Sequence, residues 1–137
     1  MRGDVEGKTL HGLRLRAREN HAAAKLLLGE GQYNAAATRA YYALYQAIVA
    51  ELEDKGRRPD EFYSPSERDK EAVKWPHVTV IRISRAAAGL EPEEQSVVRL
   101  AWEQRLQADY KPEPVQREDI EYLMGRLDGV LDSLGAL

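Results

Sequence analysis

Cysteine is absent from the 137-residue sequence. Its absence excludes disulfide bonds, thiolate catalysis and cysteine-ligated zinc, and it fits a reducing compartment. Long apolar runs are also absent, since none approaches the roughly 20 residues that span a bilayer. The polar segment 1–8 lacks the hydrophobic stretch of an export signal. We therefore expect a cytoplasmic protein that makes no contact with a membrane.

An excess of positive charge is missing as well. The formal net charge is −3 and the isoelectric point is about 5.7, whereas general nucleic-acid binders tend to be basic. Any contact with RNA or a nucleotide would therefore come from a local cluster of side chains. A chain of this length is expected to form one domain with its own core. We predict a single helical domain over 1–137, with a flexible tail at 1–8.

Phosphate-binding loops and paired metal ligands are absent too. The sequence has no glycine-rich loop of the Walker or dinucleotide type. Its three histidines, His11, His21 and His77, do not form the i, i+4 pair of a helical metal site. We therefore predict no metal and no cofactor. His77 lies beside Trp75 and Pro76, and a lone histidine at such a place more often caps or packs than catalyses.

What the sequence does contain is apolar residues at helical spacing. Helices are predicted over about 9–28, over about 35–55, from Pro76 into the SRAAAGL stretch, over 91–110 and over 116–134. Glycines within 29–33 and at Gly56 should end the first two helices, and Asn34 is the expected N-cap of the second. Because no convincing strand is present, the fold class is all-α, an up-and-down bundle of four to five helices.

Two segments between these helices allow more than one interpretation. Segment 57–74 is polar and charged, and it is predicted to be a long loop with room for one helical turn after Ser66. The β-branched run in 78–81 would also suit a strand. A helix with Pro76 in its first turn is favoured, because the apolar pattern continues past it and no partner strand is visible.

Three arginines crowd the first predicted helix, in the stretch RLRAR. On a helix, Arg14, Arg16 and Arg18 spread over about 200 degrees. They therefore do not make one tight patch. A solvated helix face is favoured over an RNA-facing stripe.

The second predicted helix carries three tyrosines in five residues, Tyr41, Tyr42 and Tyr45. Tyr41 and Tyr45 share one helix face, and Tyr42 lies about 100 degrees away. Core packing explains them if each hydroxyl finds water or a partner. Arg39, one turn before Tyr42, is not explained by core packing alone.

Three stretches together give the chain a family resemblance: TRAYYALYQAIVAEL, WPHVTVIRIS, and RLQADY with the final helix after it. Over about 35–134 they resemble the HEPN superfamily, small all-α domains named for higher eukaryotes and prokaryotes nucleotide-binding. The short branch with an Arg-x-x-Ala-Asp-Tyr signature is the most similar. The resemblance implies a homodimeric bundle and a minimal nucleotidyltransferase as partner, in pairs that resemble toxin–antitoxin systems.

For active members of that superfamily, the resemblance implies metal-independent RNA cleavage by an arginine followed, after four to six residues, by a histidine. The arginine would stabilise the phosphate and the imidazole would move a proton. No histidine follows Arg99 or Arg105 here. The spacing occurs only in the first helix, where Arg14 and Arg16 precede His21, which is the wrong place.

Arg105, Asp109 and Tyr110 occupy the matching position instead. Arg105 and Asp109 are one helical turn apart and are expected to form an ion pair. That pair would either orient Arg105 toward Arg39 and the tyrosines or tie two helices together. Tyr110 is either a packing residue or, by position, the analogue of a tyrosine that a nucleotidyltransferase partner modifies.

The leading hypothesis is that the chain is the binding and regulatory member of such a two-component module, without ordinary ribonuclease activity. One alternative is a metal-independent endoribonuclease or RNA-binding toxin, with candidate catalytic residues Arg39, His77, Arg105 and Asp109. A second alternative is a protein-interaction bundle. Candidate binding or modification residues are Tyr41, Tyr42, Tyr45 and Tyr110. Convergence of the catalytic candidates on an open polar groove would favour an enzyme. If the catalytic candidates instead form their hydrogen bonds and ion pairs within the chain, and an apolar patch stays exposed, a binding module is favoured.

Overall fold

The computed structural model describes residues 12–62 and 74–137, and it is helical throughout. The elements are α2 (Gly12–Gly29), α3 (Tyr33–Asp54), the 3-10 helix η1 (Pro59–Phe62), α4 (His77–Ile83), α5 (Pro92–Tyr110) and α6 (Arg117–Ser133). No strand occurs in these two ranges. The predicted all-α bundle is confirmed.

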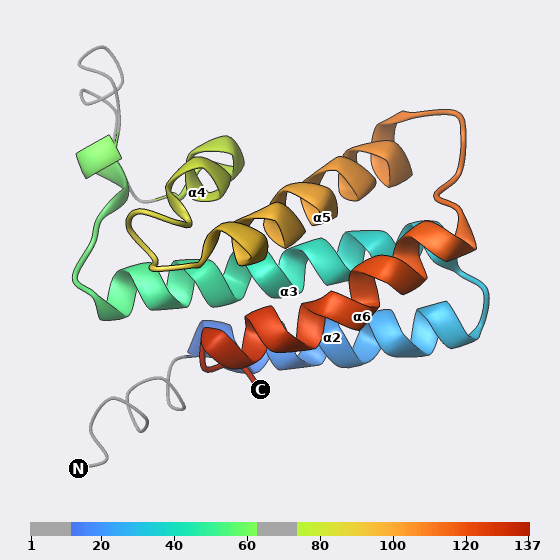
Figure 1. Cartoon of the computed structure of the whole chain (residues 1–137), viewed down its shortest axis with the longest axis horizontal. Coiled ribbons are helices and arrows are strands. Elements are labelled where there is room, and N and C mark those ends of the chain that lie inside the picture. Colours follow the sequence, from blue (N-terminus) through green and yellow to red (C-terminus); the bar gives the residue numbers. More distant parts are fainter. Residues whose placement is uncertain (1–11, 63–73) are drawn as a thin grey trace.

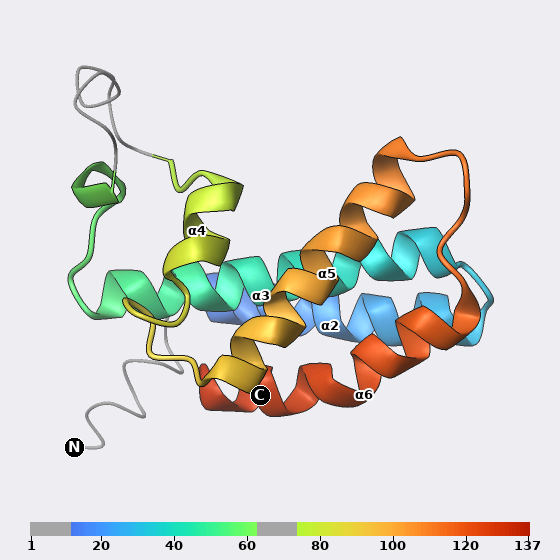
Figure 2. The same ribbon diagram turned by 45° about the horizontal axis from the view of Figure 1, so that its top comes forward.

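The long helices run alternately up and down, with α3 at the centre (Figures 1 and 2). Helix α2 returns antiparallel along α3, and α6 lies beside α2. Helix α5 crosses α3 at an angle, so that it diverges from α6 toward one end of the bundle (Figure 2). The short α4 sits across the other end of α3. Each of the other α-helices in the described residues therefore contacts α3.

Helix α3 forms the middle of the core because its apolar arc is wide. Alanines let neighbouring helices approach closely, and leucine, isoleucine and tyrosine fill the remaining space. Its buried residues are Ala36, Ala37, Ala40, Tyr41, Ala43, Leu44, Ala47, Ile48, Val49, Ala50, Glu51 and Leu52. The largely buried second helix is thus as predicted. One side of it also carries the tyrosines into contact with α4 and α5.

The helix ends differ in part from the prediction. Gly31 and Gly56 end α2 and α3 with φ of 76° and 73°, a conformation that glycine adopts without strain. Asn34 is not the N-cap, because α3 begins at Tyr33, two residues before the predicted start, and Gln32 takes that position. The Asn34 side chain instead accepts a hydrogen bond of 2.8 Å from the backbone N–H of Val115. It therefore ties α3 to the segment before α6.

The third predicted helix is shorter than expected. Pro76 occupies the N-cap position rather than the first turn, and α4 ends at Ile83. The SRAAAGL stretch forms turns after it. The Ser84 hydroxyl donates back to the carbonyl of Ile81 over 2.8 Å, an alternative to continuing the helix.

The expectation of a solvated arginine face on the first helix is wrong for Arg14. Its side chain is fully buried and forms ion pairs with Glu51, over 2.8 Å, and with Asp54. Its Nε also donates to the carbonyl of Leu134 over 2.7 Å. Arg14 therefore joins α2, α3 and the chain end after α6. Arg16, by contrast, is exposed as expected.

Several predictions fall on residues outside the described ranges. They are the tail at 1–8, the helix start at 9–11 with His11, and most of the loop at 57–74 with its turn after Ser66. Of that loop, the structure describes η1 and its flanks. In the described part of the chain, no helix is long and apolar enough to cross a membrane.

Candidate functional site

The tyrosine-rich face of α3 meets the start of α4. Tyr41 is buried at 1% exposure, whereas Tyr42 and Tyr45 are half-buried. The Tyr41 hydroxyl lies 2.6 Å from Nδ1 of His77, and the Tyr45 hydroxyl donates to the backbone carbonyl of Trp75. Each hydroxyl therefore has the partner that a packed tyrosine requires.

The imidazole of His77, at the first position of α4, lies between two aromatic rings. Its centroid is 4.4 Å from that of Tyr45 and 5.7 Å from that of Trp102, with interplanar angles of 29° and 17°. Burial lowers the pKa of His77, and the positive charge of Arg105 lowers it further. His77 is therefore neutral at neutral pH. In the described part of the chain, only its Nδ1 has a hydrogen-bond partner.

Arg105 is surrounded by aromatic rings. Its guanidinium carbon lies between 5.4 and 5.9 Å from the ring centroids of Tyr41, Tyr42, Trp102 and Tyr110. One of its terminal nitrogens donates to the Tyr42 hydroxyl over 3.4 Å. These rings attract the cation through their negative faces, and they cover it from solvent.

Asp109 provides the counter-charge for Arg105. Oδ2 of Asp109 is 2.9 Å from Nε of Arg105, the ion pair expected from their spacing. The Nε–H group does not point at this oxygen and makes no hydrogen bond, so the contact is electrostatic. The other oxygen, Oδ1, accepts a hydrogen bond of 2.9 Å from the Thr38 hydroxyl on α3. Asp109 thus fixes Arg105 against α3.

Tyr110 is the last residue of α5, and 70% of its surface is exposed. Its ring lies 5.4 Å from the guanidinium carbon of Arg105. An exposed tyrosine therefore sits directly beside an enclosed cation and its carboxylate partner. This arrangement offers one accessible phenol at a site whose charges are already balanced.

The structure gathers most of the predicted candidate residues in one place. Those that come together are His77, Arg105, Asp109, Tyr41, Tyr42, Tyr45 and Tyr110. Arg39 is not among them, because its guanidinium donates to Oδ1 of Asn20 on α2 over 3.1 Å. No contact joins Arg39 to His77 or Arg105 in the described structure. Arg39 therefore belongs to the α2–α3 surface.

Two members of this site are missing from the sequence-based candidates. Trp102 packs against Tyr41, with ring centroids 5.2 Å apart, and against His77 and Arg105. Thr38 holds Asp109. The helical spacing of the sequence could have indicated both residues. Trp102 is one turn before Arg105, and Thr38 is one turn before Tyr41, so each shares a helix face with a candidate residue. The aromatic cluster is hereafter Tyr41, Tyr42, Tyr45, His77 and Trp102.

The second place with arginine–histidine spacing does not form a comparable site. Arg14 is enclosed by its ion pairs, and Arg16 is exposed on α2. His21 is buried, with Nε2 2.6 Å from Oδ1 of Asp128 on α6. Arg14 and His21 hold helices together, and they do not line one surface with Arg16. Across the described residues, no group of three or more histidines and carboxylates could hold a metal ion.

Comparison with known families agrees with this arrangement of helices. The model of the HEPN domain family matches residues 11–136, nearly the whole chain. The chain therefore belongs to the HEPN domain family. No curated protein matches it.

Proposed function

We propose that this HEPN protein is the binding and regulatory member of a two-component module, and that a nucleotidyltransferase modifies its Tyr110. The carrying observation is the exposed phenol of Tyr110 beside the balanced Arg105–Asp109 pair. The family and the Arg-x-x-Ala-Asp-Tyr signature of the sequence support the same hypothesis. A homodimer, as the resemblance implies, is part of this proposal, and sedimentation of the purified chain tests it.

The modification would be a nucleotidyl transfer from a nucleoside triphosphate. Oη of Tyr110 attacks the α-phosphorus, a new phosphate ester forms, and the bond to the β-phosphate breaks to release pyrophosphate. The phenolic proton leaves to a base of the partner enzyme. Arg105 lies beside the ring and is positioned to attract the phosphate that becomes attached. The modification would thus place negative charge next to an enclosed cation.

The state of Arg105 argues against ordinary ribonuclease chemistry. Its side chain is 13% exposed and already paired with Asp109. To bind Arg105, the scissile phosphate of an RNA substrate would have to compete with the Asp109 carboxylate and with the surrounding rings. No histidine follows it at the spacing of the active branch. We therefore propose that Arg105 organises the site and does not cleave RNA.

The test is to express the chain together with the product of a neighbouring nucleotidyltransferase reading frame and to weigh the intact protein. We expect mass increments of one or more nucleoside monophosphate units, mapped to Tyr110 by tandem mass spectrometry. Tyr110→Phe should remove them. Tyr122→Phe, at the other strongly exposed tyrosine of the described residues, should keep them. Modification that survives in Tyr110→Phe would reject this residue as the acceptor.

A second candidate function, metal-independent RNA cleavage, is favoured by one observation. His77 is neutral at neutral pH, and its Nε2 has no partner among the described residues. A neutral imidazole is suited to take the proton of a 2′-hydroxyl. Incubation of RNA with the protein in EDTA separates the two functions. Cleavage that is lost in His77→Gln and Arg105→Ala, but kept in Arg39→Ala, would establish the nuclease and contradict our leading proposal.

A further inference from the structure

A groove runs between α5 and α6, on a side of α5 that the aromatic cluster does not use. Three adjoining hollows of about 480, 300 and 300 Å³ make it up. Leu100 and Tyr122 line both the first and the second hollow. Glu93, Val97 and Arg126 line both the second and the third. These shared walls make the hollows one continuous channel, called here the α5/α6 groove.

The spacing of the lining residues is that of a helix-packing seam. Helix α5 contributes a row at alternating steps of four and three, which the C-cap residue Lys111 continues: Glu93, Val97, Leu100, Gln104 and Gln107. Helix α6 contributes Asp119, Tyr122, Arg126 and Gly129, at steps of three, four and three. Residues at this spacing form the rows that interlock when helices pack side by side. Both walls of the groove therefore present the surface that another helix uses.

One of the two glycines inside α6 lines the groove: Gly129 leaves that part of the wall without a side chain, whereas Gly125 is not a lining residue. Gly125 and Gly129 lie inside the helix and are exposed, and a methyl group at either would meet nothing within 4 Å. Glycine in a helix interior destabilises the helix relative to alanine. Packing within the described chain therefore does not require glycine at either position. The small size of Gly129, in the wall of the groove, does allow a second backbone to approach closely, as small residues do between packed helices.

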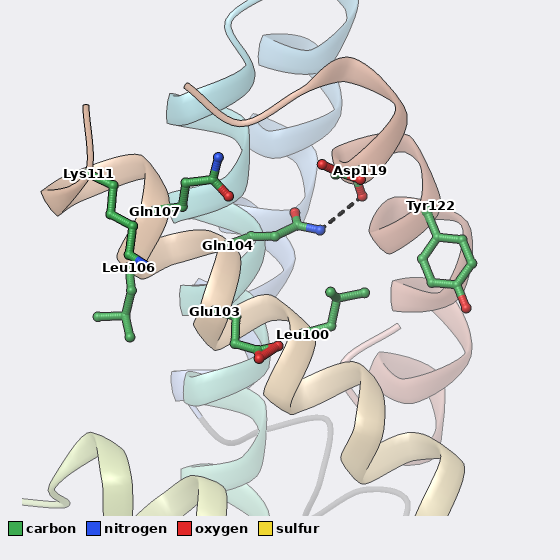
Figure 3. A pocket seen from close by; sticks show the side chains of 8 residues that line it. All are labelled: Leu100, Glu103, Gln104, Leu106, Gln107, Lys111, Asp119 and Tyr122. Atoms are coloured by element: carbon green, nitrogen blue, oxygen red, sulfur yellow. Dashed lines mark hydrogen bonds between the residues drawn. The ribbon is translucent and has the colours of Figure 1, made fainter. Parts of the chain in front are cut away.

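A buried carboxamide joins the two walls of the groove at one end. Gln104 is only 5% exposed, and its Nε2 donates to the backbone carbonyl of Asp119 over 2.9 Å (Figure 3). Its Oε1 has no hydrogen-bond partner among the described residues. Figure 3 shows this carboxamide extending from α5 toward α6, across one end of the groove. Because Oε1 is itself buried, Gln104 does not present an acceptor to an incoming chain, and its role here is to join the two walls of the groove.

The charges of the groove select the kind of helix that fits. Four carboxylates line it, from Glu93, Glu94, Glu103 and Asp119, against the cations of Lys111 and Arg126. The Arg126 guanidinium is drawn over the ring of Tyr122, 3.7 Å from its centroid. Glu93 and Glu103 form no ion pair within the described ranges. An incoming helix with lysine or arginine at its flanks would therefore be favoured.

We propose that the α5/α6 groove is the docking site for one amphipathic helix of a partner protein. Its small and aliphatic residues would pack on Val97, Leu100 and Gly129, and its basic residues would face Glu93 and Glu103. This is the helix-in-groove mode of recognition. The proposal is independent of the modification of Tyr110, because it depends on other residues.

The test is a display selection on the immobilised full chain. The library consists of helices of about five turns, the length of the groove along α5. Seam positions vary among alanine, leucine, isoleucine and valine, and each flanking position is either lysine or glutamate. We expect enrichment of lysine at the flanks. A selected peptide should then bind at least about tenfold more weakly to Gly129→Leu, because the added side chain fills the seam. Ala22→Leu, which adds a leucine on the exposed face of α2, should bind like the wild type.

Charge reversal supplies a second variant that does not depend on packing. Glu93→Lys combined with Glu103→Lys should shift the selection from lysine-flanked to glutamate-flanked peptides. Thermal melts of every variant show that the fold is kept. The proposal is overturned if no peptide is enriched, if the charge preference does not change, or if Gly129→Leu binds undiminished. It is also overturned if Gly129→Leu separates a homodimer into monomers, since the occupant would then be a second copy of this chain.

Discussion

The hydroxyl of Tyr41 lies 2.6 Å from Nδ1 of His77 and joins the buried face of α3 to the first turn of α4. Burial raises the pKa of the Tyr41 hydroxyl well above its ordinary range, with a further rise from the neighbouring Tyr45. The hydroxyl therefore stays protonated. A neutral phenol and a neutral imidazole share this hydrogen bond, so the site has its fixed positive charge only on Arg105.

Tyr41→Phe removes this hydrogen bond while keeping the ring. We expect the free energy of unfolding to fall by about 1–2 kcal/mol, because Nδ1 of His77 loses its partner in a half-buried position. Urea denaturation monitored by circular dichroism measures the change. Tyr122→Phe is the control, since the structure gives its hydroxyl no partner, and it should leave stability unchanged. Equal stability of the two variants would show that the bond contributes nothing.

The lowered pKa of His77 makes stability depend on pH in a defined direction. The unfolded chain binds a proton to this histidine more readily than the folded chain does. The resulting stabilisation is fully present above about pH 6.5 and is lost as the pH falls through the lowered folded-state value. We expect stability to decline over this window more in the wild type than in His77→Gln. Urea midpoints between pH 8 and 5 measure it, and parallel curves for the two proteins would contradict the prediction.

The helical architecture could be predicted because it depends on local spacing. Apolar residues at steps of three and four mark every long helix, and glycines mark the ends of α2 and α3. The ends of α4 could not be predicted in the same way. Its termination depends on the Ser84 hydroxyl turning back to Ile81, one of several conformations that a serine allows.

The candidate site was only partly predictable from the sequence. Tyr41, His77 and Arg105 could be named from their local pattern and the family resemblance, but their meeting depends on how α4 and α5 cross α3. Arg39 is one turn from Tyr42 along the chain, yet its guanidinium faces α2. Trp102 could be assigned to the site only once the structure showed that its face of α5 is turned toward the tyrosines. The sequence pattern of a single segment does not determine how the helices cross one another.

Arg14 shows how a buried charge escapes pattern analysis. It lies on the same face of α2 as Ala17, His21 and Ala24, all of which are buried. If every arginine is taken to be a surface residue, Arg14 interrupts the apolar stripe of this helix. In the structure it belongs to that stripe, because Glu51 and the Leu134 carbonyl on other elements satisfy it. Partners distant in sequence, rather than residue type, decide its burial.

Replacement of this arginine should therefore be costly. Arg14→Met keeps much of the side-chain volume but leaves Glu51 buried without this cation. We expect a loss of about 3–5 kcal/mol in the free energy of unfolding, as for other broken buried ion pairs. Arg16→Met, on the exposed face of the same helix, should change it by less than about 0.5 kcal/mol. Equal losses would mean that Arg14 is no more important than a surface arginine. Denaturant titrations of both variants give the comparison.

The glycines of α6 give a prediction in the opposite direction. Gly125→Ala and Gly129→Ala should each raise the free energy of unfolding of the isolated chain by up to about 1 kcal/mol. Alanine favours the helix by this amount, and the added methyl meets nothing within 4 Å. Gly31→Ala is the contrast: φ is 76° there, so the same change should cost about 1 kcal/mol. Thermal and urea unfolding of the three variants measures these shifts. A loss of stability in Gly129→Ala would mean that this glycine serves the fold of the chain, and it would remove one of the observations behind the α5/α6 groove as a docking site.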